Sequence, residues 1–159
     1  MRRTLTYILV GTVLGAPCAA AERRSWNKIH YIGGTIPIKT SPYDWDTKLT
    51  ITPNPDVIVV VIAPAKLFAP EQTVRVKTSQ VVSLSSGTAA WQRIAAVSGA
   101  QLPAKPHSLF GLWPDAGFLG IVYDAGNGKT GGILLDSFYT WQILPALGKL
   151  TGKPPERWP

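Results

Sequence analysis

The chain of 159 residues contains one cysteine, Cys18, and two histidines, His30 and His107. A disulfide needs a pair of cysteines, and a structural zinc site needs about four cysteine or histidine ligands, so the sequence predicts neither within this chain. Charged residues make up only 16% of the chain, which excludes the composition of a highly charged disordered protein. We find no pattern that predicts a cofactor.

Turn-forming residues are abundant, with 15 glycines and 14 prolines, and 45% of the residues are hydrophobic. Frequent glycine and proline suit many short strands joined by turns better than long helices. We therefore expect a mainly β (α+β) protein. The sequence shows neither an internal repeat nor a linker, so residues 22–152 are predicted to form one domain, followed by an irregular tail over 153–159.

The N-terminal residues have the layout of a secretory signal peptide. Two arginines precede an apolar run over residues 5–16, and three alanines follow at 19–21. The apolar run is shorter than the roughly 20 residues of a membrane-spanning helix. We expect residues 1–21 to be a cleaved signal and the protein to be exported, to the periplasm or the extracellular space. The alternatives are an uncleaved anchor and lipidation of Cys18.

Alternating apolar and polar residues, interrupted by turn residues, predict a series of short strands. They are expected over residues 28–32, 35–39, 48–52, 57–63, 73–77, 81–85, 108–113, 118–123 and 133–135. Apolar residues at helical spacing predict helices over 87–99 and 137–151. Pro145 interrupts the second helix, so we expect a kink there or a later start.

The strand over 57–63 is the most apolar run after the predicted signal. Valine or isoleucine occupies six successive positions, so both faces of this strand need cover. A small barrel buries one face of a strand and leaves the other for a helix, a loop or a partner. One of the two alternating sets is expected to cover an intermolecular or a helix-covered surface, and the candidates are Val57, Ile58, Val59, Val60, Val61 and Ile62.

Strands in succession followed by one amphipathic helix predict a strongly bent antiparallel sheet or small barrel, capped by the C-terminal helix. This element order, over residues 26–151, resembles the pleckstrin-homology-like superfold. The lipid-binding basic motif of some pleckstrin-homology domains has no counterpart here, and Lys39, Arg75 and Lys77 do not reproduce it. The resemblance therefore implies a fold and no binding residues.

A second likeness rests on several segments of the chain. They are Lys28-Ile29-His30-Tyr31 with Gly33-Gly34, Asp44-Trp45, Val82-Ser83-Leu84-Ser85, Leu109-Phe110-Gly111-Leu112, and Gly120-Ile121-Val122-Tyr123 through Gly128-Lys129 to Leu134-Leu135. In these segments the chain resembles small secreted bacterial proteins of unassigned function. This resemblance implies no activity.

Residues 126–131 read Gly-Asn-Gly-Lys-Thr-Gly, which matches the glycine spacing of a dinucleotide-binding loop. Such a loop delivers a pyrophosphate to the N-terminus of a helix. Here a strand pattern follows at 133–135, and no acidic residue stands about 20 positions later. We expect a β-hairpin turn instead, because glycine and asparagine tolerate the positive φ angles of such turns.

Signatures of catalysis are few. The sequence contains no Gly-x-Ser-x-Gly nucleophile elbow. Asp44 and Asp46 flank Trp45, but adjacent carboxylates in one turn do not provide the separation across a cleft that a glycosidase uses, so we expect a solvated turn. A small hydrolase is the third functional hypothesis. It requires a cleft that gathers titratable residues, with His107, Asp44 or Asp115 as candidates.

Six tryptophans are many for a chain of this length. Trp91 and Trp141 lie on the apolar faces of the predicted helices and are expected in the core. Trp45 and Trp158 lie in a turn and in the tail and are expected to be exposed. An exposed pair of this kind suits a platform for a sugar or a partner protein.

Sixteen basic against nine acidic residues give a formal net charge of +7. The basic residues are scattered, without a basic run or an aromatic-interleaved strip, so we predict no nucleic-acid partner. Lys48, Arg75 and Lys77 alternate with apolar residues on predicted strands and are the candidate contacts for an anionic ligand.

The preferred hypothesis is a non-catalytic, exported binding or scaffold domain whose partner is a protein or an envelope component. The alternative is a module that binds anionic lipid or a cell-wall polymer through Lys48, Arg75 and Lys77. We expect contact with a membrane only through an uncleaved signal or through weak attraction to an anionic surface.

Overall fold

A computed structural model of the chain describes residues 22–53, 56–64, 70–104 and 117–157. The predicted signal peptide at 1–21, the predicted strand at 108–113 and the candidate residues His107 and Asp115 lie outside these ranges. No helix within the described ranges is long and apolar enough to cross a membrane.

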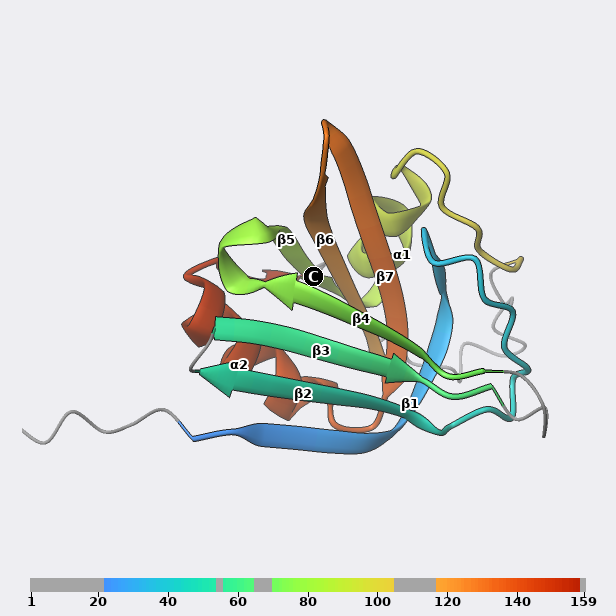
Figure 1. Cartoon of the computed structure of the whole chain (residues 1–159), viewed down its shortest axis with the longest axis horizontal. Coiled ribbons are helices and arrows are strands. Elements are labelled where there is room, and N and C mark those ends of the chain that lie inside the picture. Colours follow the sequence, from blue (N-terminus) through green and yellow to red (C-terminus); the bar gives the residue numbers. More distant parts are fainter. Residues whose placement is uncertain (1–21, 54–55, 65–69, 105–116, 158–159) are drawn as a thin grey trace, which may run out of the picture.

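The described residues form a mainly β structure with two α-helices (Figure 1). The elements are β1 (Arg24–Gly34), β2 (Thr47–Pro53), β3 (Asp56–Ile62), β4 (Gln72–Lys77), the short 3-10 helix η1 (Thr78–Gln80), β5 (Val81–Ser86), α1 (Gly87–Ala95), β6 (Phe118–Gly126), β7 (Lys129–Ser137), α2 (Thr140–Thr151) and β8 (Glu156–Arg157). The strand order is β4-β3-β2-β1-β7-β6-β5-β8. Seven strands pair antiparallel, and the two-residue β8 pairs parallel with β5.

β1 joins the two halves of the sheet because it pairs with a different strand along each half of its length. Residues Arg24 to Ile29 pair with β2, and Ile29 to Gly34 pair with β7. The register shifts between Trp26 and Ile29, where Lys28 has a φ angle of 56°. A bulge of this kind bends and twists a strand. The β2–β4 half and the β6–β7 hairpin accordingly cross steeply in Figure 1.

The sheet is not closed into a barrel. β4 and β5 lie far apart in the strand order, but in the chain only η1 connects them. The sheet is therefore bent so that these two strands lie near each other. η1 turns the chain out of β4 before β5 begins, and within the described ranges β4 and β5 do not pair. Of the two architectures predicted from the sequence, the small barrel is therefore wrong, and an open antiparallel sheet with a C-terminal helix is present.

Inward-facing side chains of the seven antiparallel strands and of α2 form one hydrophobic core. α2 contributes Ile143, Leu144 and Leu147, all of which are buried. A second, smaller cluster lies on the opposite face of β6 and β7, where α1 covers it with Ala90, Trp91 and Ile94. One half of the sheet is thus covered on both faces, by α2 and the other strands inside and by α1 outside.

Most of the predicted elements are confirmed. The strands expected over 48–52, 57–63, 73–77, 81–85, 118–123 and 133–135 are β2 to β7 in order, and the two expected helices are α1 and α2. α2 begins at Thr140, later than the apolar pattern starts, so Pro145 is its sixth residue. α1 ends at Ala95, before the predicted stop at Gly99.

Residues 35–39 were predicted as a strand, and this is wrong. β1 ends at Gly34, and the Thr35 amide donates a last ladder-like hydrogen bond of 2.9 Å to the Gly132 carbonyl. The buried Tyr31 hydroxyl then donates to the Ile36 carbonyl at 3.1 Å. The Ile38 amide donates to the same carbonyl at 2.8 Å, and Pro37 has no N–H to donate, so these backbone groups do not extend the ladder.

The C-terminal tail was predicted to be irregular, and this is wrong for residues 156–157. They form β8 against Ser85 and Ser86 of β5. The guanidinium of Arg93 on α1 donates two hydrogen bonds of 2.8 Å to the Glu156 carboxylate. This bidentate pair joins the tail to α1, which no local pattern in the tail indicates.

Candidate functional site

The candidate partner surface and the candidate anionic-ligand contacts lie on one face of β2, β3 and β4. Residues directly opposite each other in an antiparallel sheet project from the same face. The three cross-strand rows are Lys48–Val61–Thr73, Thr50–Val59–Arg75 and Thr52–Val57–Lys77. We call these nine residues the cationic valine face. α2 lies behind β2 and β3 in Figure 1, so this face is turned toward the viewer.

The two alternating sets of β3 have different surroundings. The inward set is fully buried in the hydrophobic core and consists of Ile58, Val60 and Ile62. Of the two alternative sets, this one is therefore excluded as a surface for a partner protein, because β3 turns it toward α2 and the other half of the sheet. Val57, Val59 and Val61 point the other way and are only partly buried. The candidate partner surface is therefore reduced to these three valines.

Three cations border the valine row. Lys48, Arg75 and Lys77 are exposed, with Lys48 on β2 and the other two on β4. The face contains no acidic residue, and within the described ranges none of these three side chains forms an ion pair. The described ion pair, between Arg93 and Glu156, lies on α1 and the tail. The face thus places three cations, which form no ion pair within the described ranges, around an apolar centre.

A second cluster lies where β1 meets the end of β7. The rings of His30 and Trp45 are 5.5 Å apart and tilted, and Trp45 stacks on Phe138 at 5.4 Å with 17° between the ring planes. We call these three residues the aromatic stack. Trp45 is half-buried as its middle member, whereas Phe138 is 78% exposed. The ring of Phe138 therefore covers Trp45 with one face and turns the other to solvent.

Two carboxylates accompany the aromatic stack. Asp136 lies directly opposite His30 across the β1–β7 pair, and Asp44 precedes Trp45 in the chain. Asp44 is only 4% exposed; its Oδ2 accepts a hydrogen bond of 2.7 Å from the Ser41 amide, and its Oδ1 is buried without a donor from the described residues. A buried acceptor left unpaired costs about 1–3 kcal/mol.

Burial shifts the protonation of the two facing groups. Desolvation lowers the pKa of His30 below its ordinary value of 6.5, opposed by the charges of Asp136 and Asp44. Desolvation raises the pKa of Asp136 above 3.8, opposed by His30 and by a hydrogen bond from the Ser137 backbone. Both pKa shifts favour the neutral form, because the charge of each group is poorly solvated where it lies.

The glycine-rich segment forms the tight turn of the β6–β7 hairpin. Gly126 pairs with Lys129, so Asn127 and Gly128 make a two-residue loop, and their φ angles are 54° and 71°. Two positive φ angles are those of a type I′ turn. β7 starts at Lys129, so a strand and not a helix follows the turn, and the predicted hairpin is confirmed.

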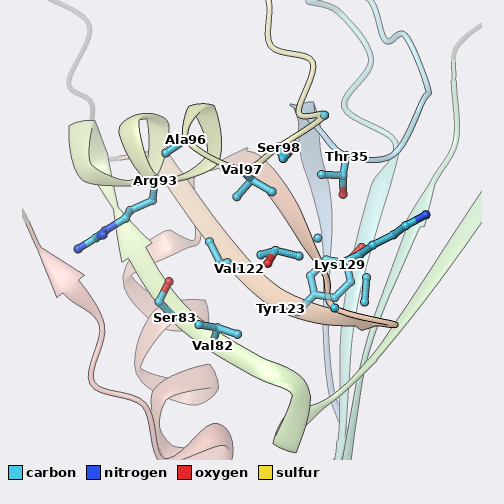
Figure 2. Close-up of a pocket in the computed structure, with 15 residues that line it drawn as sticks. Thr35, Val82, Ser83, Arg93, Ala96, Val97, Ser98, Val122, Tyr123 and Lys129 are labelled. Atoms are coloured by element: carbon cyan, nitrogen blue, oxygen red, sulfur yellow. The ribbon is translucent and has the colours of Figure 1, made fainter.

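An open groove of 890 Å³ lies beside this hairpin, between β5, β6 and the end of α1 (Figure 2). In Figure 2, Arg93 and Lys129 extend to opposite sides of the groove, away from its middle, where Val82 and Val122 lie. Arg93 is also bound to Glu156. The groove therefore does not direct cations at a phosphate.

The remaining predicted residues are placed as follows. Trp91 on α1 is buried, as expected, but Trp141 is 73% exposed, so its prediction as a core residue is wrong. Trp141 lies on the first turn of α2, away from the buried Thr140 and Ile143. Asp46 is exposed, as expected for a solvated turn, but the same prediction is wrong for Asp44, which is buried, and Trp45 is half-buried where exposure was expected. Trp158 lies outside the described residues.

The hydrolase hypothesis requires a cleft that gathers titratable residues. Asp44 does lie with His30 and Asp136, whereas His107 and Asp115 lie outside the described residues. Within the described ranges, no three His, Cys, Asp or Glu side chains are grouped as a metal site requires. Sequence reasoning did not connect His30 with Asp136 and Phe138, because His30 is distant from both in the chain and no fixed spacing relates them.

Comparison of the chain with protein-family models, with curated proteins and with solved structures gave no match.

Proposed function

We propose that this protein is a non-catalytic binding domain that attaches to an anionic phospholipid surface through the cationic valine face. One observation carries the proposal. Lys48, Arg75 and Lys77 come from two different strands, surround a half-buried apolar row, and share their face with no acidic residue.

The energetics of membrane attachment favour an anionic lipid surface as the partner of the cationic valine face. A basic side chain near an anionic lipid surface contributes about 1 kcal/mol, and the attraction falls off within a Debye length. The valine row adds apolar area that withdraws from water when the flat face meets the headgroup region. Three cations and three partly buried valines support reversible attachment that is sensitive to salt.

The proposal includes two further predictions from the sequence. The domain would act after export, which depends on the predicted signal at 1–21. Seven antiparallel strands precede α2, with α1 inserted between β5 and β6, and we keep a pleckstrin-homology-like fold as part of the proposal. A protein partner seated on the same face and an anionic wall polymer are the competing occupants, and the experiment separates them from lipid.

The test is sedimentation of the purified full chain with vesicles of phosphatidylcholine, with and without phosphatidylglycerol, over a series of salt concentrations. We expect binding only to the phosphatidylglycerol vesicles, weakening as salt rises. The variant Lys48→Gln/Arg75→Gln/Lys77→Gln should bind at least about tenfold more weakly, since three contributions of about 1 kcal/mol are removed.

A matched control removes three positive charges elsewhere. Lys129→Gln/Lys149→Gln/Lys153→Gln changes the same net charge at exposed positions off the face, and it should change binding by less than about threefold. Equal losses in both triple variants would show that net charge and not this face drives binding. Binding to soluble polyphosphate without binding to the vesicles would replace lipid by an anionic polymer. Absence of binding to both would leave a protein partner and overturn the proposal.

A further inference from the structure

Two consecutive arginines stand where the chain enters β1, and they lie on opposite sides of the sheet. Arg24 pairs with Ile51 of β2, and Ser25 pairs with Thr50. The hydroxyl oxygens of Ser25 and Thr50 are 3.0 Å apart, so both side chains project from the cationic valine face, to which Thr50 belongs. Side chains alternate between the two faces of a strand, so Arg23 shares this face with Ser25 and Arg24 does not.

Arg23 extends one of the three rows of the cationic valine face. Continued by one residue, the β1–β2 register sets Arg23 opposite Thr52, which begins the row Thr52–Val57–Lys77. Arg23 is exposed, and among the residues that the structure describes it forms no ion pair. The start of β1 lies beside the end of β2 in Figure 1, as this row requires. A cation therefore stands at each end of the row.

Acidic residues lie near the face but are distributed unevenly. Glu22 and Asp56 are close to Arg23 in the sheet, and the alternation of side chains turns both toward the opposite side. At the other end of the face, Asp46 and Glu71 stand immediately before the first residues of β2 and β4. The positive charge of the face is therefore concentrated at the end where Arg23 lies.

The four cations are spread widely over the sheet. Neighbouring strands lie about 4.8 Å apart, so Arg23 and Lys77 are separated by roughly 14 Å across the strands. Lys48 lies roughly 13 Å from their row along β2. Valines fill the space between, and the groove of Figure 2 lies on the other half of the sheet. Such a wide, flat distribution suits several separate charges better than one polyanionic headgroup, which needs cations that converge on a pocket.

We propose that Arg23 is the fourth cation of the lipid-binding face, and that this face engages several singly charged headgroups of an anionic bilayer at once. The inference rests on the proposed function and deepens it by naming the lipid class, phospholipids that carry one negative charge each, such as phosphatidylglycerol. Arg23 and Lys77 enter the headgroup region together, and the valines between them lie against the surface of the bilayer.

Sedimentation of the full chain with vesicles tests the fourth cation through two matched variants. Arg23→Gln and Arg24→Gln each remove one positive charge from exposed neighbours in the chain. At physiological salt, Arg23→Gln should weaken binding to phosphatidylglycerol vesicles about fivefold. Arg24→Gln should weaken it less than about twofold, because salt screens charges on the far side of the sheet. Arg23→Lys keeps the charge and should restore binding, and unchanged urea midpoints show that the variants are folded.

The composition of the vesicles and a soluble competitor test the lipid class. If several headgroups are engaged at once, binding must rise more than proportionally with the mole fraction of phosphatidylglycerol. Soluble inositol trisphosphate should displace the protein no better than sodium sulfate of equal ionic strength. Binding in simple proportion to the mole fraction, or selective displacement by inositol trisphosphate, overturns the assignment of the lipid class.

The outcomes separate this inference from the proposed function. If the wild-type chain binds no phosphatidylglycerol vesicle, both fail. If the wild type binds and the triple variant Lys48→Gln/Arg75→Gln/Lys77→Gln does not, the proposed function stands. In that case, equal binding by Arg23→Gln and Arg24→Gln overturns the fourth cation alone.

Discussion

The phenol ring of Tyr123 lies over Gly131, its direct partner across the β6–β7 pair. A Cβ atom on residue 131 would lie 2.2 Å from Tyr123 Cζ, so the ring occupies the space that any side chain would need. Gly131 is buried by this contact. The Tyr123 ring therefore packs over a glycine-rich stretch of β7 that has no side chains of its own to pack.

Gly131→Ala should lower the free energy of unfolding by about 1–3 kcal/mol, because the Tyr123 ring must leave its position. Urea denaturation monitored by circular dichroism measures the change. In the double variant Tyr123→Ala/Gly131→Ala the clash is absent, so the alanine at 131 should cost less than in the wild-type background. An equal cost in both backgrounds would show that the ring is not the cause.

Neighbouring residues of β3 should respond very differently to truncation. Ile58→Ala should cost about 2–5 kcal/mol, since the side chain is 0% exposed and its loss leaves a cavity. Val59→Ala, on the cationic valine face, should cost less than about 1 kcal/mol, because part of that side chain is already in water. Chemical denaturation of both variants checks the assignment of the two faces. Similar losses would contradict it.

Asp136 gives the stability of the protein a pH dependence of known sign. Its pKa is raised above 3.8 in the folded protein, so the unfolded chain ionises first as pH rises, and folding is penalised above that pH. Asp136→Asn should therefore stabilise the protein at neutral pH by up to about 1 kcal/mol after solvent screening. The gain should vanish below the ordinary carboxyl pKa of 3.8. Urea denaturation at both pH values measures it, and an equal gain in acid would point to packing.

Pro145 lies inside α2 and is exposed, so its ring adds little to the core. A proline within a helix removes one backbone hydrogen bond and crowds the carbonyl four residues earlier, here that of Trp141. Pro145→Ala should raise the free energy of unfolding by about 1–2 kcal/mol, since the restored hydrogen bond outweighs the greater freedom of the unfolded chain. Thermal denaturation measures the gain. Pro145→Gly, which restores the N–H without helix propensity, should gain less.

Local patterns predicted the parts of the fold whose cause is local. Lys48 to Thr52 and Thr73 to Lys77 alternate between apolar and polar residues, and both segments are strands with the expected faces. The Asn127-Gly128 turn follows from the positive φ angles that its two residues tolerate. The predicted strand at 35–39 failed because the Ile36 carbonyl accepts from the Tyr31 hydroxyl and from the Ile38 amide instead of from a neighbouring strand.

The candidate sites depended on pairing that no local pattern encodes. Lys48 and Lys77 belong to different strands, and the register of β3 with both neighbours places them around one row of valines. Asp136 reaches His30 only because β7 pairs with the second half of β1. Trp141 was assigned to an apolar helical face from the sequence, yet it is exposed because α2 turns the face that carries Ile143, Leu144 and Leu147 to the core.

The sequence by itself determined most of the strands, where the tight turn lies and that β3 has two apolar faces, because side-chain alternation and turn preferences act between near neighbours. Only the tertiary structure decided which of those faces enters the core and which residues meet at the aromatic stack. The reason is the bend in β1, where one strand changes partner from β2 to β7. Such a change of partner depends on the packing of the whole sheet, and it brings together residues that are more than a hundred positions apart in the chain, such as His30 and Asp136.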